Sequence, residues 1–332
     1  MENSVQQIQQ IPLRERVIII TPAVRQWHGA TTMHAQDFQC AAEELPPEKA
    51  RKSLGAKYLI NPDSLLVFRK LRKRLFTTLA EAGIADPVLK GSYFIPLEKA
   101  DEVIEKIERF CQEYQAEADA FADRYDQLTQ EWALENPEFS TQILAAGKTK
   151  HQIRARFGCS FSAYKMSPIP GQEQAIEDRV KNLIGPILDE ASETARAALD
   201  TYIRNKDEDK GGLRLRARIV KIVDKLESMS CVNGNLYTLC EKLRPLVDSL
   251  PTKKTGFKGQ SFYTAFTCLH VLASKELMQA VAEGKADLDA LSESLRIERE
   301  EERRLKAPET GRLTAAVIRK AEDMKETVDA LW

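Results

Sequence analysis

A stripe of apolar residues between Leu97 and Trp132 constrains the fold of this chain more than any other feature. Its members recur at alternating steps of three and four residues: Leu97, Ala100, Ile104, Ile107, Cys111, Tyr114, Ala118, Phe121, Tyr125, Leu128 and Trp132. This repeat of 3.5 residues is typical of a helix whose apolar side is covered by another helix along most of its length. Pro96 suits a first helical position, and Asn136-Pro137 supplies the end. The pattern therefore predicts a helical rod about 60 Å long in a coiled coil.

The partner of this rod is expected between Ile176 and Tyr202, where apolar residues again recur at helical spacing around a break at Gly185-Pro186. The first stripe mixes small and large residues, which favours an irregular hairpin within one chain over a uniform zipper. A second chain covering the stripe stays an alternative, so the oligomeric state is open. The Pro- and Gly-containing segment 137–172 is then the connector at the distant tip of a stalk.

A small globular base is expected from the segments that precede the stripe. The run Arg16-Val-Ile-Ile-Ile-Thr21 predicts a strand whose partner is Ser92-Tyr-Phe-Ile95, and a helix is predicted from Asn61-Pro62 to Gly83. The expected fold class is mainly α, with a long antiparallel coiled-coil hairpin on a small α+β helical base. The expected parts are a disordered N-terminus (1–12), the N-terminal part of the base (13–95, a short β ribbon plus helices), the stalk (96–205) with its tip connector (137–172), helices returning to the base (206–250) and a charged helical region (251–332).

The composition excludes several classes of function. The 332 residues include 49 basic and 50 acidic side chains, and this balance gives no field that draws the whole chain to nucleic acid or to a membrane. No apolar run has the length of a membrane span, and the N-terminus does not resemble a secretion signal, so we expect a cytoplasmic protein. The six cysteines form no CxxC pair and the four histidines are dispersed, which predicts reduced thiols and no metal site.

Motifs of catalysis are weak. Gly147-Lys148-Thr149 resembles the end of a phosphate-binding loop, but Gln142 occupies the place of the first glycine and no apolar strand precedes it. The sequence also contains no Gly-x-Ser-x-Gly and no His-Glu-x-x-His. Trp27, beside Gly29, is interpreted as a cap on the core of the base more readily than as a recognition edge. We therefore expect no enzyme and no cofactor.

Two groups of basic residues are candidates for binding. The first mixes cations with aromatic residues in the connector, which suits a partner contact at an exposed tip: Arg154, Arg156, Phe157, Phe161 and Tyr164. Alanine at Arg156 and Phe157 should then abolish partner binding without lowering the melting temperature. The second group surrounds the inward-facing Leu71 on the helix of the base and is a possible nucleic-acid contact: Arg69, Lys70, Arg72, Lys73 and Arg74.

The chain also resembles a bacterial family, domain of unknown function 3150. The likeness spans roughly Leu13 to Leu250 and is carried by Val17-Ile-Ile-Ile-Thr-Pro-Ala-Val-Arg-Gln-Trp27, Ser53-Leu-Gly-Ala-Lys57 with Asn61-Pro62, Gly91-Ser-Tyr-Phe-Ile-Pro96, and Arg154-Ala-Arg-Phe-Gly158 leading to Tyr164. The resemblance implies a gene that often lies beside that of a MoxR-type AAA+ ATPase, sometimes with a von Willebrand factor A protein, on mobile elements and phages. It supplies no catalytic residues.

These observations favour a non-enzymatic helical adaptor, or remodelling target, that presents its stalk to a MoxR-type AAA+ ATPase. The alternative is a nucleic-acid-binding accessory protein of a mobile element, which rests on the two basic groups. An enzyme is the third possibility, and it would need a cleft with convergent titratable groups.

Overall fold

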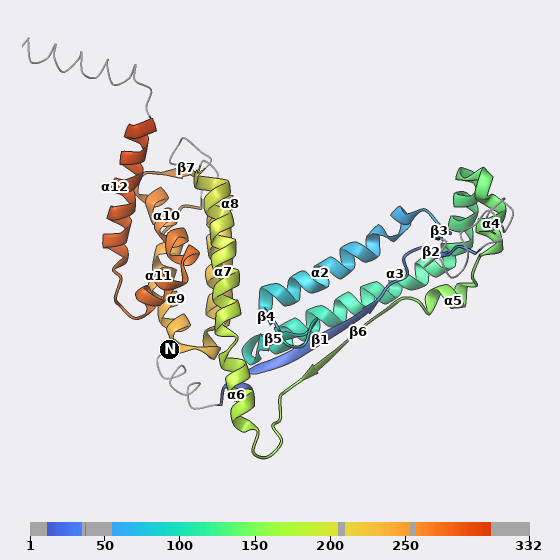
Figure 1. The fold of residues 1–332 in the computed structure, drawn as a ribbon, viewed down its shortest axis with the longest axis horizontal. Coiled ribbons are helices and arrows are strands. Elements are labelled where there is room, and N and C mark those ends of the chain that lie inside the picture. The colour runs from blue at the N-terminus through green and yellow to red at the C-terminus, as the bar shows by residue number, and fades with distance from the viewer. Residues whose placement is uncertain (1–11, 35–36, 38–54, 205–209, 253–255, 307–332) are drawn as a thin grey trace, which may run out of the picture. The chain divides into compact units, whose positions relative to one another are not determined.

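The protein is mainly α-helical and divides into two compact units (Figure 1). The computed structural model describes residues 12–34, 37, 55–204, 210–252 and 256–306. Unit 1 comprises residues 1–187 and 231–233, and unit 2 comprises residues 188–230 and 234–332. The boundaries expected at 95/96 and 250/251 fall inside these units, and the expected disordered segment 1–12 lies outside the described residues except for Pro12.

Unit 1 combines helices with short strands. Its helices are α2 (Leu66–Ala82), α3 (Ala100–Glu135), α4 (Ser140–Ala145), α5 (Lys150–Arg154) and α6 (Glu173–Lys181), with 3-10 turns η1 (Leu13–Glu15), η5 (Pro62–Leu65), η6 (Leu97–Lys99) and η7 (Pro137–Phe139). Its strands are β1 (Val17–Arg25), β2 (Ala30–Thr32), β3 (Ala56–Tyr58), β4 (Ile84–Ala85), β5 (Tyr93–Pro96) and β6 (Gly158–Tyr164). The turn η9 (Ser230–Val232) lies at the point where the chain rejoins unit 1.

Strand β1 organises a four-stranded antiparallel sheet in the order β4-β5-β1-β6. The predicted pairing of β1 with β5 is confirmed, in a register that places Ile18 opposite Ile95. The second half of β1 pairs with β6, in a register that places Val24 opposite Cys159. Among the residues that the structure describes, only β6 pairs with β1 past Ile20. Pro22 therefore lies where no other described strand needs a donor on that edge, and its missing amide donor is tolerated.

Helix α3 confirms the predicted rod, but its buried side is wider than a coiled-coil stripe. Its buried side chains are Ala100, Val103, Ile107, Tyr114, Ala118, Phe121, Ala122, Tyr125, Thr129 and Ala133. Helices α2, α4 and α5 and strand β6 pack on it, and α2 and the β1–β6 ribbon both run along its length (Figure 1). Because a helix and a sheet cover α3 together, more of its circumference is buried than in a two-helix seam. The antiparallel coiled-coil pairing with residues 176–202 is therefore not confirmed.

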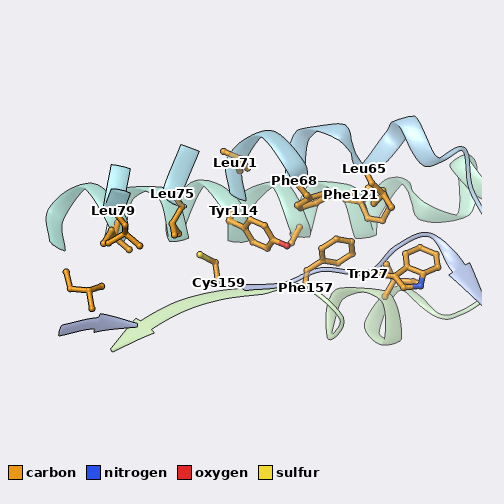
Figure 2. Close-up of a cluster of buried hydrophobic side chains, with 14 of the residues drawn as sticks. Trp27, Leu65, Phe68, Leu71, Leu75, Leu79, Tyr114, Phe121, Phe157 and Cys159 are labelled. Carbon is orange, nitrogen blue, oxygen red and sulfur yellow. The ribbon is translucent and has the colours of Figure 1, made fainter. Parts of the chain in front are cut away.

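The core of unit 1 lies between α2, α3 and the inner face of the sheet (Figure 2). Phe68 of α2 is fully buried, and its ring contacts those of Tyr114 and Phe121 of α3 edge to face at centroid distances of 5.2 and 5.6 Å. The hydroxyl of Tyr114 donates a 2.7 Å hydrogen bond to the carbonyl oxygen of Arg25, and burial raises the pKa of Tyr114 to about 12. This bond ties the end of β1 to the middle of α3.

The connector 137–172 is not a distant tip. After η7 and α4, the chain turns into α5, whose N-terminus is closed by a capping box between Thr149 and Gln152. It then runs back along α3 as strand β6. The expected tip is wrong for a physical reason: Phe157, Cys159 and Phe161 alternate with small residues at the period of a strand, and this apolar side packs on α3.

Helix α6 contacts η1, Asp86 and Phe94 through hydrogen bonds and charged side chains. Glu177 accepts hydrogen bonds from the backbone amide of Leu13, at 3.0 Å, and from the guanidinium of Arg14, at 2.8 Å. Arg179 binds the carboxylate of Asp86, which is fully buried, and lies 5.6 Å from the ring centroid of Phe94. These contacts hold α6 against η1 and against the part of the sheet near β4 and β5.

Unit 2 is a helical bundle. Its elements are the greater part of α7 (Ile184–Leu199), η8 (Asp200–Arg204), β7 (Lys210–Gly211), α8 (Leu213–Ser228), α9 (Gly234–Asp248), β8 (Phe257–Lys258), α10 (Gln260–Ala273), α11 (Lys275–Ala282) and α12 (Leu288–Lys306). The break expected near Gly185-Pro186 is found between α6 and α7. Helices α8 and α9 fall within the segment 206–250 that was expected to be helical, but they pack on each other and on α10 and α11. Their predicted return to the base is not confirmed, because unit 1 takes only residues 231–233 from this region.

The expected charged helical region includes helix α12, and one side of this helix is covered. Helix α12 packs on α10, with Leu295 buried and the guanidinium of Arg299 lying over the rings of Phe262 and Phe266. Residues 307–332 of the expected C-terminal region lie outside the described residues. Across the described residues, the structure contains no helix that combines the length and apolarity needed to span a bilayer.

Candidate functional site

The strongest candidate for a binding surface is the exposed side of α2, here called the basic face. It consists of Arg69, Lys70, Arg72, Lys73 and Arg74, all of which are exposed. Leu71, between them, is only 5% exposed and packs into the core, as predicted. The local sequence explains this arrangement, because Phe68, Leu71 and Leu75 occupy one side of the helix and leave the cations on the other.

The cations of the basic face differ in their partners. Arg74 pairs with Glu113 of α3, with a 3.0 Å separation between its Nη1 and the carboxylate Oε1, and its guanidinium lies 4.9 Å from the ring centroid of Phe110. Arg72 lies 5.6 Å from the ring centroid of Phe76. The remaining three (Arg69, Lys70 and Lys73) form no ion pair with any described residue. The face therefore carries uncompensated positive charge, although the whole chain has a net charge of −1.

A groove between α2 and α3 borders the basic face. Its first section has a volume of about 470 Å³ and is lined by Lys70, Lys73, Arg74, Thr77, Thr78 and Phe110. Its second section, of about 560 Å³, continues along α3 and shares Arg74, Thr78 and Phe110 with the first. In this second section acidic and basic side chains alternate, as in the pairs Lys106–Glu102 and Arg74–Glu113. Only the first section is therefore strongly cationic.

The connector residues predicted as a contact surface do not form one. Phe157 is 2% exposed and its ring contacts those of Phe68 and Phe121 at centroid distances of 4.5 and 5.3 Å. Phe161 is partly buried against the same core. Both point inward because they lie on the side of the chain that faces α3 (Figure 2 shows Phe157). Phe157 and Phe161 are thus core residues, which corrects the prediction for these two positions.

The three other residues of that group, Arg154, Arg156 and Tyr164, differ in their contacts and exposure. Arg154 is held against α3: its Nη2 donates a 2.6 Å hydrogen bond to Oε1 of Gln115, and its Nε binds Asp119. This hydrogen bond from Arg154 lowers the pKa of the Asp119 carboxyl. Arg156 and Tyr164 are exposed, and Arg156 forms no ion pair with a described residue. Of the predicted contact surface, these two side chains remain accessible.

The other singled-out motifs have structural roles. Trp27 is 5% exposed, donates from its indole nitrogen to the carbonyl oxygen of Ala30 at 3.2 Å and packs edge to face on Tyr125, which confirms its interpretation as a cap on the core. Thr149 of the Gly-Lys-Thr sequence caps α5, and the amide of Lys148 donates to the hydroxyl of Tyr125 at 3.3 Å. Among the described residues, no three His, Cys, Asp or Glu side chains lie in an arrangement that could hold a metal ion.

Sequence reasoning missed two features of unit 1. Phe110 borders the groove. The sequence feature that could have indicated this is that Phe110 is a large apolar residue of the helix that lies outside the apolar stripe. Cys111 of α3 lies against Cys159 of β6, with 2.8 Å between the two sulfur atoms. No spacing in the sequence predicts this pair, because it forms only when β6 runs back along α3.

Comparison with known proteins identifies the family. A search of curated proteins found no match, and neither did a search of solved structures. A family model described as "Protein of unknown function (DUF3150)" matches residues 14–274. The match therefore extends beyond Leu250, where the resemblance was expected to end, through α10. Because it covers more than half of the sequence, the chain belongs to this DUF3150 family.

Proposed function

We propose that this protein is a non-enzymatic binding protein that holds the phosphate backbone of a nucleic acid against the basic face of α2. The observation that carries this proposal is the set of five exposed cations on six consecutive residues, four of them without a carboxylate partner in the described part of the chain. A polyanion gains affinity at such a surface because each phosphate that is neutralised releases condensed counterions.

The geometry of the face suits an extended backbone. Lys70 and Arg74 lie one helical turn apart, as do Arg69 and Lys73, so the charges form two rows with a spacing of about 5–6 Å along α2. Phe110 lies beside the cationic section of the groove and offers an aromatic ring next to the phosphates. At moderate salt, charges are screened over about 8–10 Å. Charged residues far from the basic face therefore contribute little to its attraction for phosphates. We therefore expect binding that does not depend on the nucleotide sequence and that weakens as the salt concentration rises.

This function predicts that charge reversal on the basic face weakens binding. The double variant Lys70→Glu/Lys73→Glu should lower affinity for labelled single- or double-stranded DNA at least tenfold at moderate salt. Fluorescence anisotropy at several salt concentrations should also show a shallower salt dependence, by roughly 0.7–0.9 in slope for each phosphate that the variant no longer neutralises. Both side chains are exposed, so the fold should be retained.

The matched control is Lys165→Glu/Lys181→Glu, which makes the same change of charge at two exposed lysines outside the basic face. It should leave affinity within about twofold of the wild type, since long-range effects are screened. Equal losses in both double variants would show a nonspecific effect of net charge. Absence of salt-dependent binding in the wild type would reject the nucleic-acid function altogether.

A second candidate is an adaptor or remodelling target for a MoxR-type AAA+ ATPase, with a von Willebrand factor A protein as a further partner. Family resemblance suggests it, and one observation favours it: within the described residues β6 is an edge strand that pairs only with β1, and Ser160, Ser162 and Tyr164 on it are exposed. An open edge can accept an added strand from a partner. The contact would then involve β6 and the neighbouring Arg156, with no need for a coiled-coil stalk.

An affinity pull-down from the native host, with nuclease added, tests the adaptor function. We expect an AAA+ ATPase among the bound proteins, with a yield that changes with its nucleotide state. Arg156→Glu/Tyr164→Ala should remove it, whereas Arg109→Glu, at an exposed position of α3, should not. If the double variant still binds the ATPase, then β6 and Arg156 are not the contact surface for it. Recovery of nucleic acid without nuclease, and of no protein with it, would favour the first function.

A further inference from the structure

Two cysteines from different elements of unit 1 face each other. Cys111 of α3 and Cys159 of β6 have their sulfur atoms 2.8 Å apart. Non-bonded heavy atoms in ordinary contact stay about 3.5–4.0 Å apart, and bonded disulfide sulfurs lie about 2.05 Å apart. Both side chains are free thiols in this structure, yet they are already closer than packing alone requires.

The surrounding contacts hold the pair in place. The register of the sheet fixes Cys159 opposite Val24, and the bond from Tyr114 to the carbonyl of Arg25 anchors that part of the ribbon on α3. The side chain of Gln115 donates to the carbonyl oxygen of Cys159 at 3.4 Å and accepts from Arg154 at 2.6 Å. The approach of the two sulfurs thus follows from the docking of β6 and not from one flexible rotamer.

The two thiols differ in accessibility and in acidity. Cys159 is 8% exposed, whereas Cys111 is only partly buried. The hydrogen bond from Cys159 lowers the pKa of the Cys111 thiol, and the same contact raises the pKa of the Cys159 thiol. Elsewhere, burial raises the pKa of the Cys240 and Cys268 thiols to about 12. Of the five cysteines in the described part of the chain, Cys111 is therefore the one that a small oxidant in water would reach first as a thiolate.

We propose that Cys111 and Cys159 form a reversible intramolecular disulfide when the protein meets a hydroperoxide. The Cys111 thiolate attacks the terminal oxygen of the peroxide, the O–O bond breaks, and the alkoxide leaves and takes up the thiol proton, which produces a sulfenic acid and an alcohol or water. The sulfur of Cys159 then attacks the sulfenic sulfur and forms the S–S bond. The hydroxyl leaves with the proton of Cys159 as water. Two thiols are oxidised, and one peroxide is reduced.

The crosslink would fasten the edge strand of the sheet to the longest helix of unit 1. It closes the chain between Cys111 and Cys159, which includes α4 and α5. A disulfide across a loop of this length restricts the unfolded chain strongly. The oxidised protein should therefore melt at a temperature at least about 5 °C higher than the reduced protein.

Peptide mapping of the full-length wild-type protein tests the proposal directly. Reduced protein, freed of reductant, is exposed to hydrogen peroxide at low molar excess, its remaining thiols are alkylated, and its peptides are identified by mass spectrometry. We expect a crosslinked species that joins the peptides of Cys111 and Cys159, a loss of two hydrogens from the intact mass, and reversal by dithiothreitol. This mapping does not depend on whether a variant folds.

Variants supply the controls. Cys111→Ser and Cys159→Ser should each lose the crosslink and the rise in melting temperature, whereas Cys231→Ser should retain both. Cys231 is a suitable control because it is also partly buried in unit 1, and burial raises its pKa to about 11. Conversion of Cys111 to a sulfinic or sulfonic acid without the crosslink would overturn the proposal, as would a different cysteine pair or a disulfide between two chains.

Discussion

Phe157→Ala should lower the free energy of unfolding of unit 1 by about 3–5 kcal/mol, the range of large-to-small changes at buried phenylalanines. The ring lies between α2, α3 and the start of β6, in contact with Phe68 and Phe121. Its removal leaves a cavity where rigid elements meet, so the surroundings can relax only partly. Hydrogen exchange of peptides from β6 and α3 during urea titration measures the loss within unit 1 alone, since two units need not unfold together.

Arg156→Ala and Tyr164→Ala are the controls, because they truncate exposed side chains of the same segment. Each should change the free energy of unfolding by no more than about 0.5 kcal/mol. If Phe157→Ala were equally mild, the ring could not be part of the core. The burial of Phe157 also reverses the expectation that its truncation leaves the melting temperature unchanged, so a loss of partner binding in this variant would not identify a contact residue.

Gly83→Ala should cost about 3 kcal/mol of stability, the upper part of the usual range for overpacking. A Cβ atom at this position would lie 2.0 Å from the carbonyl oxygen of Phe94 and 2.6 Å from Cδ1 of Ile95. Neither neighbour has room to move away, because β5 pairs with β1 on one side and with β4 on the other. The same measurement of hydrogen exchange, on peptides of α2 and β5, reports the loss.

Gly185→Ala is the matched control for this change. Apart from its two neighbours in the chain, a Cβ atom at Gly185 meets nothing within 4 Å, and the residue lies in the first turn of helix α7. The helical preference of alanine and the restriction imposed by Pro186 oppose each other there, so Gly185→Ala should change the free energy of unfolding by no more than about 1 kcal/mol. An equally mild effect at Gly83 would mean that the end of α2 does not approach β5 as closely as the structure shows.

The parts of the fold that depend on local pattern were predictable. The 3.5-residue repeat established α3, and Pro96 and Pro137 placed its limits within a few residues. The β-branched run at the start of β1 and its partner Tyr93–Pro96 followed from their shared composition. A periodic stripe, however, shows only that one side of a helix is buried. Whether a helix or a sheet covers it depends on contacts between segments far apart in the chain, which the period does not contain.

The connector shows why the candidate contact surface was misplaced. Its aromatic residues were weighed by composition, and a mixture of cations and aromatics suits a binding surface. The spacing was the better indicator: Phe157, Cys159 and Phe161 recur every second residue, with Gly158 and Ser160 between them, as in a half-buried strand. The outward position of the cations of the basic face was predictable, because it depends on the periodicity of α2 alone; their role as a nucleic-acid contact stays a prediction. The groove was not predictable, since α3 supplies its other wall.

The shared use of β1 by two partners has a consequence for how the nascent chain folds. Val17–Ile20 must await residues 93–96, and Thr21–Arg25 must await residues 158–162, whereas the helical turns of α2 and α3 depend on neighbours in sequence. Such non-local pairing raises contact order and slows folding. On the ribosome, β1 is made well before either of its partner strands, and during that interval its apolar start is open to chaperones or to aggregation.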